Sequence, residues 1–581
     1  LKKMSELGYI TAEEYDQAKK EVVVFNTQAQ NSIKAPHFVF YILDYLQEKY
    51  GKDVMENGGY TITTTLDYEL QKKAEELVLE NALKNEKDFR ASNSGLIATD
   101  PNTGQILALV GSRDYFDKTI DGAYNIVTAK RQPGSSFKPF VYAAGFQKGY
   151  TPETILFDVD TEFSTTCGSN PSSCYNPNDF DGLFKGPISV RNALIESRNV
   201  PAVKMLYLVG LDDALAFAKN LGVTGLRDKS QYGLSLVLGG GEVSLLDMAT
   251  AYGVFATGGI KNNTTGILSI KDHTGTTIEE FESVPTQVVE KNITLQISDI
   301  LSGTPYAVNG TAAKTGTTDD NKAAWVMGYS PSVVVGVWSG NNDNKPMTKG
   351  STISVPTWKS FMQEALKKYP AAAFEKPLPD PEYSSLKPVL RGQWLGNKSI
   401  WIDKITGKRA TENTPLNARE ERVVTDVQDI LYWINKSDPR GPAPSNPASD
   451  PQFTLWNAAV QKWWAENKNN YTVITEDSLP TEYETVHTDQ NKPIVQIQGL
   501  PSEIKITDKP TITITNTNQF PLTTVDVFIG DTYINTLSSP FRFIFSPKEY
   551  GYTPGTYVLK VSATNSIYAV THKEQSFTIT Q

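Results

Sequence analysis

The sequence is poor in the residues that build most metal sites and histidine-dependent active sites. It contains two cysteines and four histidines in 581 residues. The histidines lie far apart and have no carboxylate or cysteine neighbours at metal-ligand spacing, so we expect no metal. None of them lies in a motif that orients a catalytic base, which disfavours a Ser-His-Asp hydrolase. We also expect no cofactor, because the one glycine triplet is not followed by the Gly-Lys-Ser/Thr of a phosphate loop.

Two further absences concern charge and hydropathy. Lys and Arg number 55 against 65 Asp and Glu, a net charge of −10, so the basic surface of a nucleic-acid-binding protein is missing. No apolar run reaches the roughly 18 residues of a membrane span, and no signal peptide is recognisable. The chain begins with Leu1 instead of Met, and we expect it to be a fragment whose membrane anchor lies upstream.

The length predicts several domains, roughly four at about 150 residues each. The balance of 39% apolar and 21% charged residues excludes a disordered chain. Changes in pattern along the chain predict five parts: residues 1–35, 36–90 (a linker subdomain), 91–370, 371–490 and 491–581.

The two cysteines, Cys167 and Cys174, lie in a loop rich in Gly, Asn, Pro and Ser. Without a CxxC motif, we favour a disulfide that closes a surface loop. A disulfide would imply an oxidising compartment outside the cytoplasm. The alternative is two free thiols in a cytosolic loop.

The first 90 residues are predicted to be mainly helical. Thr11 followed by Glu14 is a capping-box pattern within one or two helices in residues 1–30. Further helices are expected over residues 37–50 and 68–84, with a strand over residues 59–65 between them.

From about residue 95 the pattern predicts an α+β domain. Residues 95–112 form a hairpin pattern around an Asp-Pro-Asn-Thr-Gly turn, and a meander of short strands follows residue 310. The segment between them is predicted to be helical, including a helix capped by Ser244 with Asp247 at its third position. Strands at both ends of a helical middle predict an antiparallel sheet assembled from distant segments.

The C-terminal third is predicted to have two parts. Residues 371–490 are rich in Pro and Trp and are expected to be an irregular extension packed on its neighbours. From residue 493 onwards, short stretches of alternating apolar and polar residues predict a small all-β sandwich of immunoglobulin type.

A candidate nucleophile lies in the segment RQPGSSFKPF. Pro139 fits only in the first turn of a helix, which places a helix start near Ser135. The Ser135 hydroxyl would then lie at the positive helix end, with the Lys138 amine one turn away on the same face. A serine next to a lysine base is an alternative to Ser-His. By itself S-x-x-K is weak evidence, because Ser384/Lys387 and Ser502/Lys505 match it too.

Two later segments strengthen this candidate. Ser197-Arg198-Asn199 lies between two predicted helices, and Lys314-Thr315-Gly316-Thr317 lies on a strand of small residues. A glycine within a strand indicates close approach of another backbone. S-x-x-K, S-D-N and K-T-G in this order are the motif set of β-lactamases and penicillin-binding proteins, with Arg198 here replacing the middle Asp.

With these motifs the chain resembles the class A penicillin-binding proteins from about Leu1 to Phe361. Five segments are each similar to blocks of that family: GLIATDPNTGQILALVGS, RQPGSSFKPFVYAAG, YNPNDFDGLFKGPISVRNALIESRNVPAVKML, LGGGEVSLLDMATAYGVFATGG and AAKTGTT. The N-terminal ELGYITAEEYDQAKK resembles the tail that follows the family's glycosyltransferase domain. The resemblance implies a serine transpeptidase-like domain in a membrane-anchored, bifunctional protein that here lacks most of the glycosyltransferase region.

The resemblance also implies roles for the candidate residues. Ser135 would attack the carbonyl between the two terminal D-alanines of a peptidoglycan stem peptide, and Lys138 would take its proton. Lys138 must be neutral for this, so burial and the second cation Lys314 would have to lower its pKa from about 10.4. Ser197 would pass the proton to the leaving D-alanine, and Asn199 would hold the Lys138 amine and the substrate amide.

Residues of the K-T-G strand complete the implied site. The Thr315 and Thr317 hydroxyls would hold the substrate carboxylate, with Gly316 between them. The N–H groups of Ser135 and Thr317 would form an oxyanion hole. An amine from a neighbouring stem peptide would then resolve the acyl-enzyme and make a cross-link, whereas a β-lactam would acylate the same serine and leave slowly.

The implied location is the extracytoplasmic face of a bacterial cytoplasmic membrane. The implied partners are peptidoglycan stem peptides and β-lactams, with cell-wall, divisome or elongasome proteins as possible partners of the C-terminal β-domain. Three alternatives stay open: a D,D-carboxypeptidase that uses water, a β-lactamase or β-lactam sensor, and a non-catalytic wall-binding scaffold. A β-lactamase would need a carboxylate to activate the deacylating water.

Overall fold

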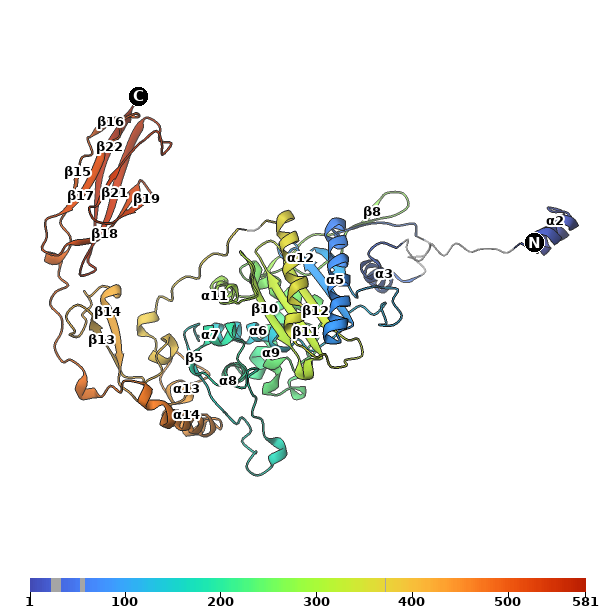
Figure 1. The fold of residues 1–581 in the computed structure, drawn as a ribbon, viewed down its shortest axis with the longest axis horizontal. Helices are drawn as coiled ribbons and strands as arrows, with labels where there is room; N and C mark the ends of the chain where they lie inside the picture. Colours follow the sequence, from blue (N-terminus) through green and yellow to red (C-terminus); the bar gives the residue numbers. More distant parts are fainter. Residues whose placement is uncertain (22–32, 53–57, 371) are drawn as a thin grey trace. The chain divides into compact units, whose positions relative to one another are not determined.

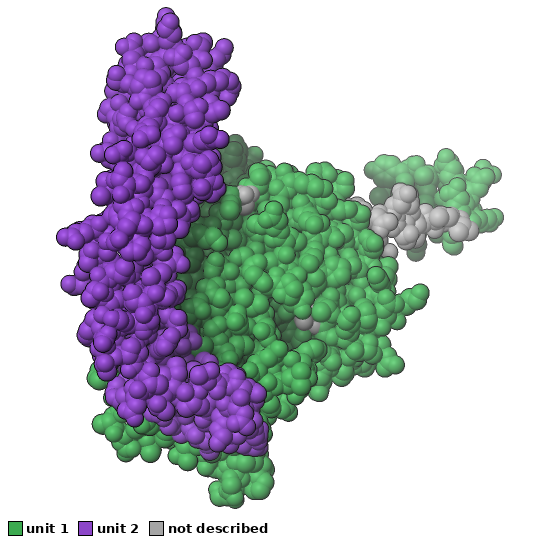
Figure 2. Space-filling view, turned by 60° about the vertical axis from the view of Figure 1, so that its left-hand side comes forward, with its two compact units in different colours: residues 1–386, 430–456 green, residues 387–429, 457–581 purple. Residues whose placement is uncertain are grey.

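A computed structural model describes residues 1–21, 33–52, 58–370 and 372–581 (Figure 1). Internal packing groups the chain into two compact units (Figure 2). Unit 1 comprises Leu1–Leu386 and Ile430–Trp456, and unit 2 comprises Lys387–Asp429 and Asn457–Gln581. Within the described ranges, no helix combines the length and the apolar character that a bilayer crossing requires. The five-part division stays a prediction.

Unit 1 is built around a five-stranded antiparallel sheet with strand order β10-β11-β12-β2-β3. The first and last thirds of the domain meet in this sheet, because Asn93 of β2 lies opposite Gly340 of β12 and Thr99 opposite Val334. This confirms the predicted assembly from distant segments. The strands are β2 (Asn93–Thr99), β3 (Ile106–Val110), β10 (Ala312–Thr317), β11 (Ala323–Tyr329) and β12 (Val334–Gly340).

Helices cover both faces of this sheet. On one face, α5 (Tyr68–Phe89) and α12 (Val355–Lys368) lie side by side and share a hydrophobic core with the strands (Figure 1). On the other face, α10 (Leu245–Ala256) packs on β2, β11 and β12, and α11 (Lys291–Ser302) packs on β10. Because both faces are covered, every residue of β2, β3, β11 and β12 is buried. Strands of this kind have continuous apolar runs instead of alternation.

The helical middle of unit 1 supplies the nucleophile and its surroundings. Its helices are α6 (Lys138–Gln147), α7 (Val190–Ile195), α8 (Asn199–Val209) and α9 (Leu211–Leu221), together with α10 and α11. The predicted cap of α10 is confirmed, since the Ser244 side chain accepts a hydrogen bond from the N–H of Asp247. Small strand pairs lie between the helices: β4 (Ile155–Asp158) with β5 (Gly186–Ser189), and β6 (Ile260–Lys261) with β9 (Thr286–Gln287).

The N-terminal helices follow the sequence pattern. Helices α1 (Lys2–Glu6) and α2 (Ala12–Ala18) form, and Thr11 makes the predicted capping box with Glu14. The rest of that prediction, over residues 22–30, lies outside the described residues. Helix α3 (Pro36–Tyr50) matches its prediction, whereas α5 runs five residues beyond the predicted end at residue 84, to Phe89. Strand β1 (Thr61–Thr64) pairs with β7 (Ile267–Lys271), and β7 pairs with β8 (Thr277–Glu280).

Cys167 and Cys174 form a disulfide, as predicted. The Phe163 N–H donates to the Tyr175 carbonyl at 2.9 Å, which closes the base of the loop. The Glu162 carboxylate lies near the two sulfurs, but it accepts the N–H groups of Ser164 and Tyr175. Because the sulfurs are bonded to each other, this trio has no thiolate to offer a metal.

The Pro/Trp-rich segment is more regular than predicted. Helix α14 (Phe453–Asn467) runs for 15 residues, and a strand pair joins β13 (Ser399–Asp403) to β14 (Arg419–Val423). The expectation of an irregular extension is therefore wrong over α14. Trp456 and Val460 are fully buried one turn apart on this helix, a helical spacing that the surrounding prolines obscured. A one-turn helix, α13 (Ile430–Trp433), belongs to unit 1.

The C-terminal residues form the predicted β-sandwich. One sheet has strand order β15-β17-β20 and the other β16-β22-β21-β18-β19, and apolar side chains from both sheets make one core. The pairing of β16 with β22 is parallel. The strands are β15 (Val495–Gln498), β16 (Glu503–Lys505), β17 (Thr511–Asn516), β18 (Leu522–Ile529), β19 (Thr532–Leu537), β20 (Arg542–Ile544), β21 (Gly555–Asn565) and β22 (Val570–Thr580).

Candidate active site

Ser135 lies in a tight turn that leads into helix α6. The turn is the 3-10 helix η2 (Gly134–Phe137), and regular α-helix begins at Lys138, three residues later than the sequence suggests. Pro139 lies in the first turn of α6, as predicted. Ser135 is half-buried and lines a cavity of about 710 Å³.

Three glycines let three backbone segments meet at this turn. A Cβ on Gly316 would lie 2.1 Å from the Pro133 carbonyl oxygen, and one on Gly134 would lie 2.3 Å from the Thr317 carbonyl oxygen. A Cβ on Gly239 would lie 2.2 Å from the Gly134 nitrogen. The expectation that Gly316 marks a close backbone approach is therefore confirmed. Gly239, from the glycine triplet, holds the opposite side of the turn.

Lys138 is the first residue of α6 and is fully buried. Its Nζ donates to the carbonyl oxygens of Ser197 at 2.5 Å and Arg198 at 3.0 Å, and to Oδ1 of Asn199 at 2.8 Å. Burial and the nearby Lys314 ammonium hold the pKa of Lys138 well below its ordinary value. In its neutral form the amine can donate only two of these three hydrogen bonds and keeps a lone pair, which is what a general base at this position needs.

Lys314 approaches the same turn from strand β10. Its Nζ donates to Oγ of Ser197 at 2.7 Å and to the Thr315 carbonyl oxygen at 2.9 Å. Burial lowers the pKa of Lys314 to about 7. Two buried lysines therefore meet at Ser197.

Ser197 lies in the turn between α7 and α8, as predicted. Its φ of 60° is in the left-handed region, which costs a non-glycine residue roughly 1–2 kcal/mol. In this conformation the Ser197 carbonyl accepts a hydrogen bond from Lys138, and the Ser197 hydroxyl accepts one from Lys314. A positive φ in a non-glycine residue, together with the two lysine contacts, makes this turn a candidate functional turn.

The K-T-G strand forms one wall of the cavity. Thr315 and Thr317 line the cavity. Gly316 does not line it, because Gly316 packs against the turn that presents Ser135. The Thr317 nitrogen lies 2.8 Å from where a Gly134 Cβ would be, so the Thr317 amide is next to the nucleophile's turn. Six of the eight predicted site residues line the cavity: Ser135, Ser197, Asn199, Lys314, Thr315 and Thr317. A seventh, Lys138, contacts the lining residue Asn199.

Arg198, which replaces the expected middle Asp, does not line the cavity. It is 4% exposed, and its guanidinium binds the carboxylates of Asp158 at 2.8 Å and Asp181 at 2.8 Å. A third carboxylate, Asp179, lies 3.2 Å from Nη2. Burial and the adjacent Asp179 carboxyl raise the pKa of Asp158. This cluster was missed by the sequence reasoning, although the Asp-Phe-Asp pattern of residues 179–181 was a visible signal.

The other two S-x-x-K matches have no comparable surroundings. Ser384 lies in a 3-10 turn, and Ser502 directly precedes strand β16. Neither serine lies at the start of an α-helix, and neither lines the cavity of Ser135. None of the four histidines lines it either.

Two carboxylates line the cavity, and each is paired with a lysine at the surface. Glu196 lies 3.5 Å from Lys185, and Asp320 lies 3.3 Å from Lys322. Their side chains are 42% and 71% exposed, so neither is buried beside the nucleophile.

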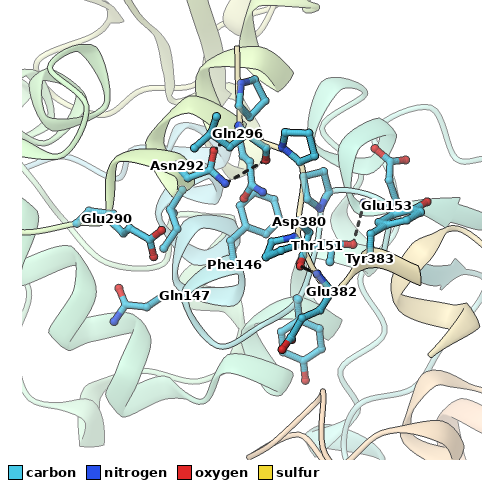
Figure 3. A pocket seen from close by; sticks show the side chains of 18 of the residues that line it. Phe146, Gln147, Thr151, Glu153, Glu290, Asn292, Gln296, Asp380, Glu382 and Tyr383 are labelled. Carbon is cyan, nitrogen blue, oxygen red and sulfur yellow. Dashed lines mark hydrogen bonds between the residues drawn. The ribbon is translucent and has the colours of Figure 1, made fainter. Parts of the chain in front are cut away.

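A second cavity of unit 1 has a volume of about 760 Å³. Figure 3 shows the side chains that line it. The proline-rich residues 377–383 cross it, and the Asn292 side chain holds them by hydrogen bonds to the backbone of Leu378. Its arginines are paired: Arg191 with Glu153, and Arg440 with Asp380. None of the predicted catalytic residues lines it.

Comparison with known proteins identifies the domain that carries this site. Residues 95–363 match the model of the penicillin binding protein transpeptidase domain. Penicillin-binding protein 2D of Bacillus subtilis (strain 168) is 31% identical over 368 residues, covering 59% of this chain and 51% of that protein. Penicillin-binding protein 1A of Neisseria meningitidis serogroup B (strain ATCC BAA-335 / MC58) is 35% identical over 291 residues, covering 47% of this chain and 36% of that protein.

Residues 95–363 form a penicillin-binding protein transpeptidase domain, and over this region the chain is similar to the class A penicillin-binding proteins. This confirms the resemblance seen in the motifs. The chain spans about half the length, or less, of the curated relatives it matches.

Solved structures of penicillin-binding proteins share the fold. Penicillin-Binding Protein 1A from Haemophilus influenzae superposes with a TM-score of 0.54 at 20% identity, over 72% of this chain and 80% of that one. The PonA1 protein from Mycobacterium tuberculosis, solved in complex with penicillin V, gives a TM-score of 0.52 at 20% identity, over 60% of this chain and 97% of that one. At this identity the likeness shows the fold: a penicillin-binding protein transpeptidase domain of mixed α and β structure.

Proposed function

We propose that the chain is a penicillin-sensitive D,D-transpeptidase that cross-links peptidoglycan stem peptides through an acyl-enzyme on Ser135. The observation that carries the proposal is the meeting of two buried lysines at Ser197, beside the turn that presents Ser135. Family membership supports the reaction class, an acyl transfer by a penicillin-binding protein transpeptidase domain.

In the first half-reaction, the Ser135 hydroxyl adds to the carbonyl between two terminal D-alanines. Lys138 in its neutral form accepts the hydroxyl proton as the C–O bond forms. The developing oxyanion would lie against the N–H groups of Ser135 and Thr317, and two such donors stabilise it by several kcal/mol.

Collapse of the tetrahedral intermediate breaks the C–N bond. The leaving D-alanine nitrogen needs one proton, which the Ser197 hydroxyl would supply while Lys314 replaces it; the hydrogen bond from Lys314 to the Ser197 hydroxyl supports this relay. The products of this step are free D-alanine and the Ser135 ester of the shortened stem peptide.

In the second half-reaction, the amine of a neighbouring stem peptide attacks the ester. The amine passes one proton through Ser197 to Lys314, which the first half-reaction left neutral. Lys138 returns its proton to the Ser135 oxygen as the ester C–O bond breaks, and a new amide bond joins the two stems. During the first half-reaction of this scheme, the Thr315 and Thr317 hydroxyls hold the donor's terminal carboxylate, which then leaves with the D-alanine. A β-lactam carries a carboxylate and a reactive amide in one molecule and would acylate Ser135 in the same way.

The disulfide supports a position outside the cytoplasm, at the extracytoplasmic face of a bacterial membrane. The all-β sandwich of unit 2 is proposed to contact cell-wall material or other wall-synthesis proteins. The D,D-carboxypeptidase alternative differs only in the acceptor. The β-lactamase alternative is less favoured, because both cavity carboxylates are exposed and paired with lysines.

The test combines labelling with turnover. The chain is incubated with fluorescent penicillin, and then with a stem peptide ending in D-Ala-D-Ala, with and without an amine acceptor. A transpeptidase gives labelled Ser135 and a cross-linked product that requires the acceptor. Hydrolysed peptide alone would indicate a carboxypeptidase, rapid loss of label would indicate a β-lactamase, and absence of label would favour the scaffold.

A further inference from the structure

Phe180 is an exposed aromatic side chain at the edge of the active-site cavity. It is 94% exposed, and it lines the same cavity as Ser135. Covering a phenylalanine side chain contributes about 1.5–3 kcal/mol. A ring that is left uncovered beside a nucleophile is therefore available to a bound substrate.

The two neighbours of Phe180 hold it in place through one arginine. Asp179 and Asp181 both lie on the guanidinium of Arg198, at 3.2 and 2.8 Å. Arg198 also donates to the carbonyl of Leu183, beyond the second aspartate. A chain segment bound on both sides of one residue presents that residue in a defined direction. We call residues 179–181 with Arg198 the Asp-Phe-Asp clasp.

The clasp is tied directly to the catalytic group. The Asp179 carboxylate accepts the backbone N–H of Asn199, and the Asn178 carbonyl accepts the Asn199 side-chain amide at 2.8 Å. Asn199 in turn binds Lys138 at 2.8 Å. The contacts that position Phe180 therefore come from the side of the cavity that carries Asn199. Thr315 and Thr317 belong to another wall, strand β10.

This arrangement divides the bound donor peptide between two walls. In the proposed mechanism, the β10 threonines hold the terminal carboxylate, which belongs to the leaving D-alanine. The implied role of Asn199 in holding the substrate amide would direct the acyl side of the donor along the wall that carries Asn199 and Phe180. The first side chain on that side belongs to the residue that precedes the two D-alanines.

We propose that Phe180 is a specificity-determining residue that packs on the side chain preceding the two D-alanines of the donor, and on the amide side chain of a β-lactam. The inference rests on the proposed function, because it takes the acyl-serine reaction as given. Phe180 takes no part in bond making. It raises the rate only for donors and β-lactams that carry a side chain on the acyl side.

The experiment compares two β-lactams that differ in this side chain. Benzylpenicillin carries a phenylacetyl amide, whereas 6-aminopenicillanic acid has a bare amine in its place. Second-order acylation rates of Ser135 are measured by mass spectrometry for the full chain and for Phe180→Ala. We expect Phe180→Ala to slow benzylpenicillin about tenfold and to change 6-aminopenicillanic acid by less than about twofold.

Leu183→Ala is the matched control. Leu183 is 63% exposed in the same loop, does not line the cavity, and accepts the hydrogen bond from Arg198 with its backbone carbonyl, which the substitution keeps. It should leave both rates unchanged. Asp181→Ala removes one of the carboxylates that bind Arg198, so it should lose part of the selectivity for benzylpenicillin over 6-aminopenicillanic acid. The double variant, Asp181→Ala with Phe180→Ala, should be no less selective than Phe180→Ala alone.

The outcomes separate this inference from the proposed function. If Phe180→Ala slows both β-lactams equally, or neither, the specificity role is overturned while labelling of Ser135 still supports the transpeptidase. If the unaltered chain is acylated by neither compound, both proposals fail. Unchanged melting temperatures for all variants exclude a folding defect as the cause of a selective loss.

Discussion

Lys138 and Lys314 contact Ser197 through different atoms of that residue. Lys138 donates to its carbonyl oxygen at 2.5 Å, and Lys314 donates to its hydroxyl at 2.7 Å. Two buried ammonium groups so close to each other repel, and burial penalises each charge. The pair therefore favours one neutral and one charged lysine, which is the combination that a base and an acid in one reaction require.

Replacing Ser135 should abolish covalent chemistry without unfolding the protein. Ser135→Ala removes only the half-buried hydroxyl, so the free energy of unfolding should change by about 0.5 kcal/mol or less. The melting temperature should therefore stay close to that of the parent. Fluorescent penicillin should no longer label the chain. Ser384→Ala and Ser502→Ala serve as controls and should label normally, and a label that moves to either serine would refute the assignment.

The lysine pair predicts a bell-shaped pH dependence of acylation. Lys138 must be neutral, which sets the acidic side, and Lys314 must be charged. Because the pKa of Lys314 is about 7, its ammonium is lost as the pH rises through that value, and the acylation rate should fall above it.

Lys314→Arg tests the origin of that fall. Arginine stays protonated across the range, so the alkaline decline should disappear even if the maximum rate is lower. The measurement is the second-order rate of penicillin acylation between about pH 5 and 10. An alkaline decline that persists in Lys314→Arg would assign it to another group.

The contact between the turn and strand β10 predicts that Gly316→Ala disables the site. The new methyl would lie 2.1 Å from the Pro133 carbonyl oxygen, so the strand or the turn must move. A misplacement of about 1 Å near the reacting groups costs roughly a hundredfold in rate. We expect penicillin acylation to fall by about that factor.

Gly233→Ala is the control for the glycine change. Gly233 has no atom within 4 Å of an added Cβ and no positive φ, so its substitution should leave acylation unchanged. Normal acylation by Gly316→Ala would show that the backbone contact does not set the site's geometry.

Reduction of the Cys167–Cys174 disulfide should loosen its loop without unfolding unit 1. The closed loop is short and exposed, so the entropic stabilisation is roughly 2–3 kcal/mol and is confined to the loop. Hydrogen exchange should increase between Phe163 and Phe180. Acylation should change by less than about tenfold, an effect below ~1.4 kcal/mol on the barrier.

The opposite outcomes for the disulfide are also informative. Two free thiols in protein exported from the cytoplasm would reject the bridge, and loss of all penicillin binding on reduction would make the loop part of the catalytic machinery. An intermediate loss confined to benzylpenicillin would connect the loop to Phe180.

Much of the site followed from local sequence because its groups are adjacent in the chain or carried by motifs. Pro139 marks a helix start on any backbone, which placed Ser135 and Lys138 correctly to within one turn. The contact of Gly316 with another backbone was also predictable, because a glycine in a strand has few other uses. The backbone that Gly316 contacts was not predictable, because the sequence around Pro133 carries no signal that the two segments meet.

Features that depend on distant partners were not predicted. Arg198 looked like a substitution in a motif, and its three aspartates lie up to 40 residues away in the chain. Helix α14 was missed because prolines around it outweighed the spacing of Trp456 and Val460. The end of α5 was misplaced because tertiary packing, more than helix propensity, extended it to Phe89.

The central sheet also orders events during synthesis. Ser135 leaves the ribosome long before β10, yet the turn that presents it is held by Gly316 and Thr317. Pairing of β2 must likewise wait for β12. Contacts between such distant segments form late, because closing a long loop precedes any gain in contacts. A nascent chain therefore carries its nucleophile without a complete site until β10 has also been made.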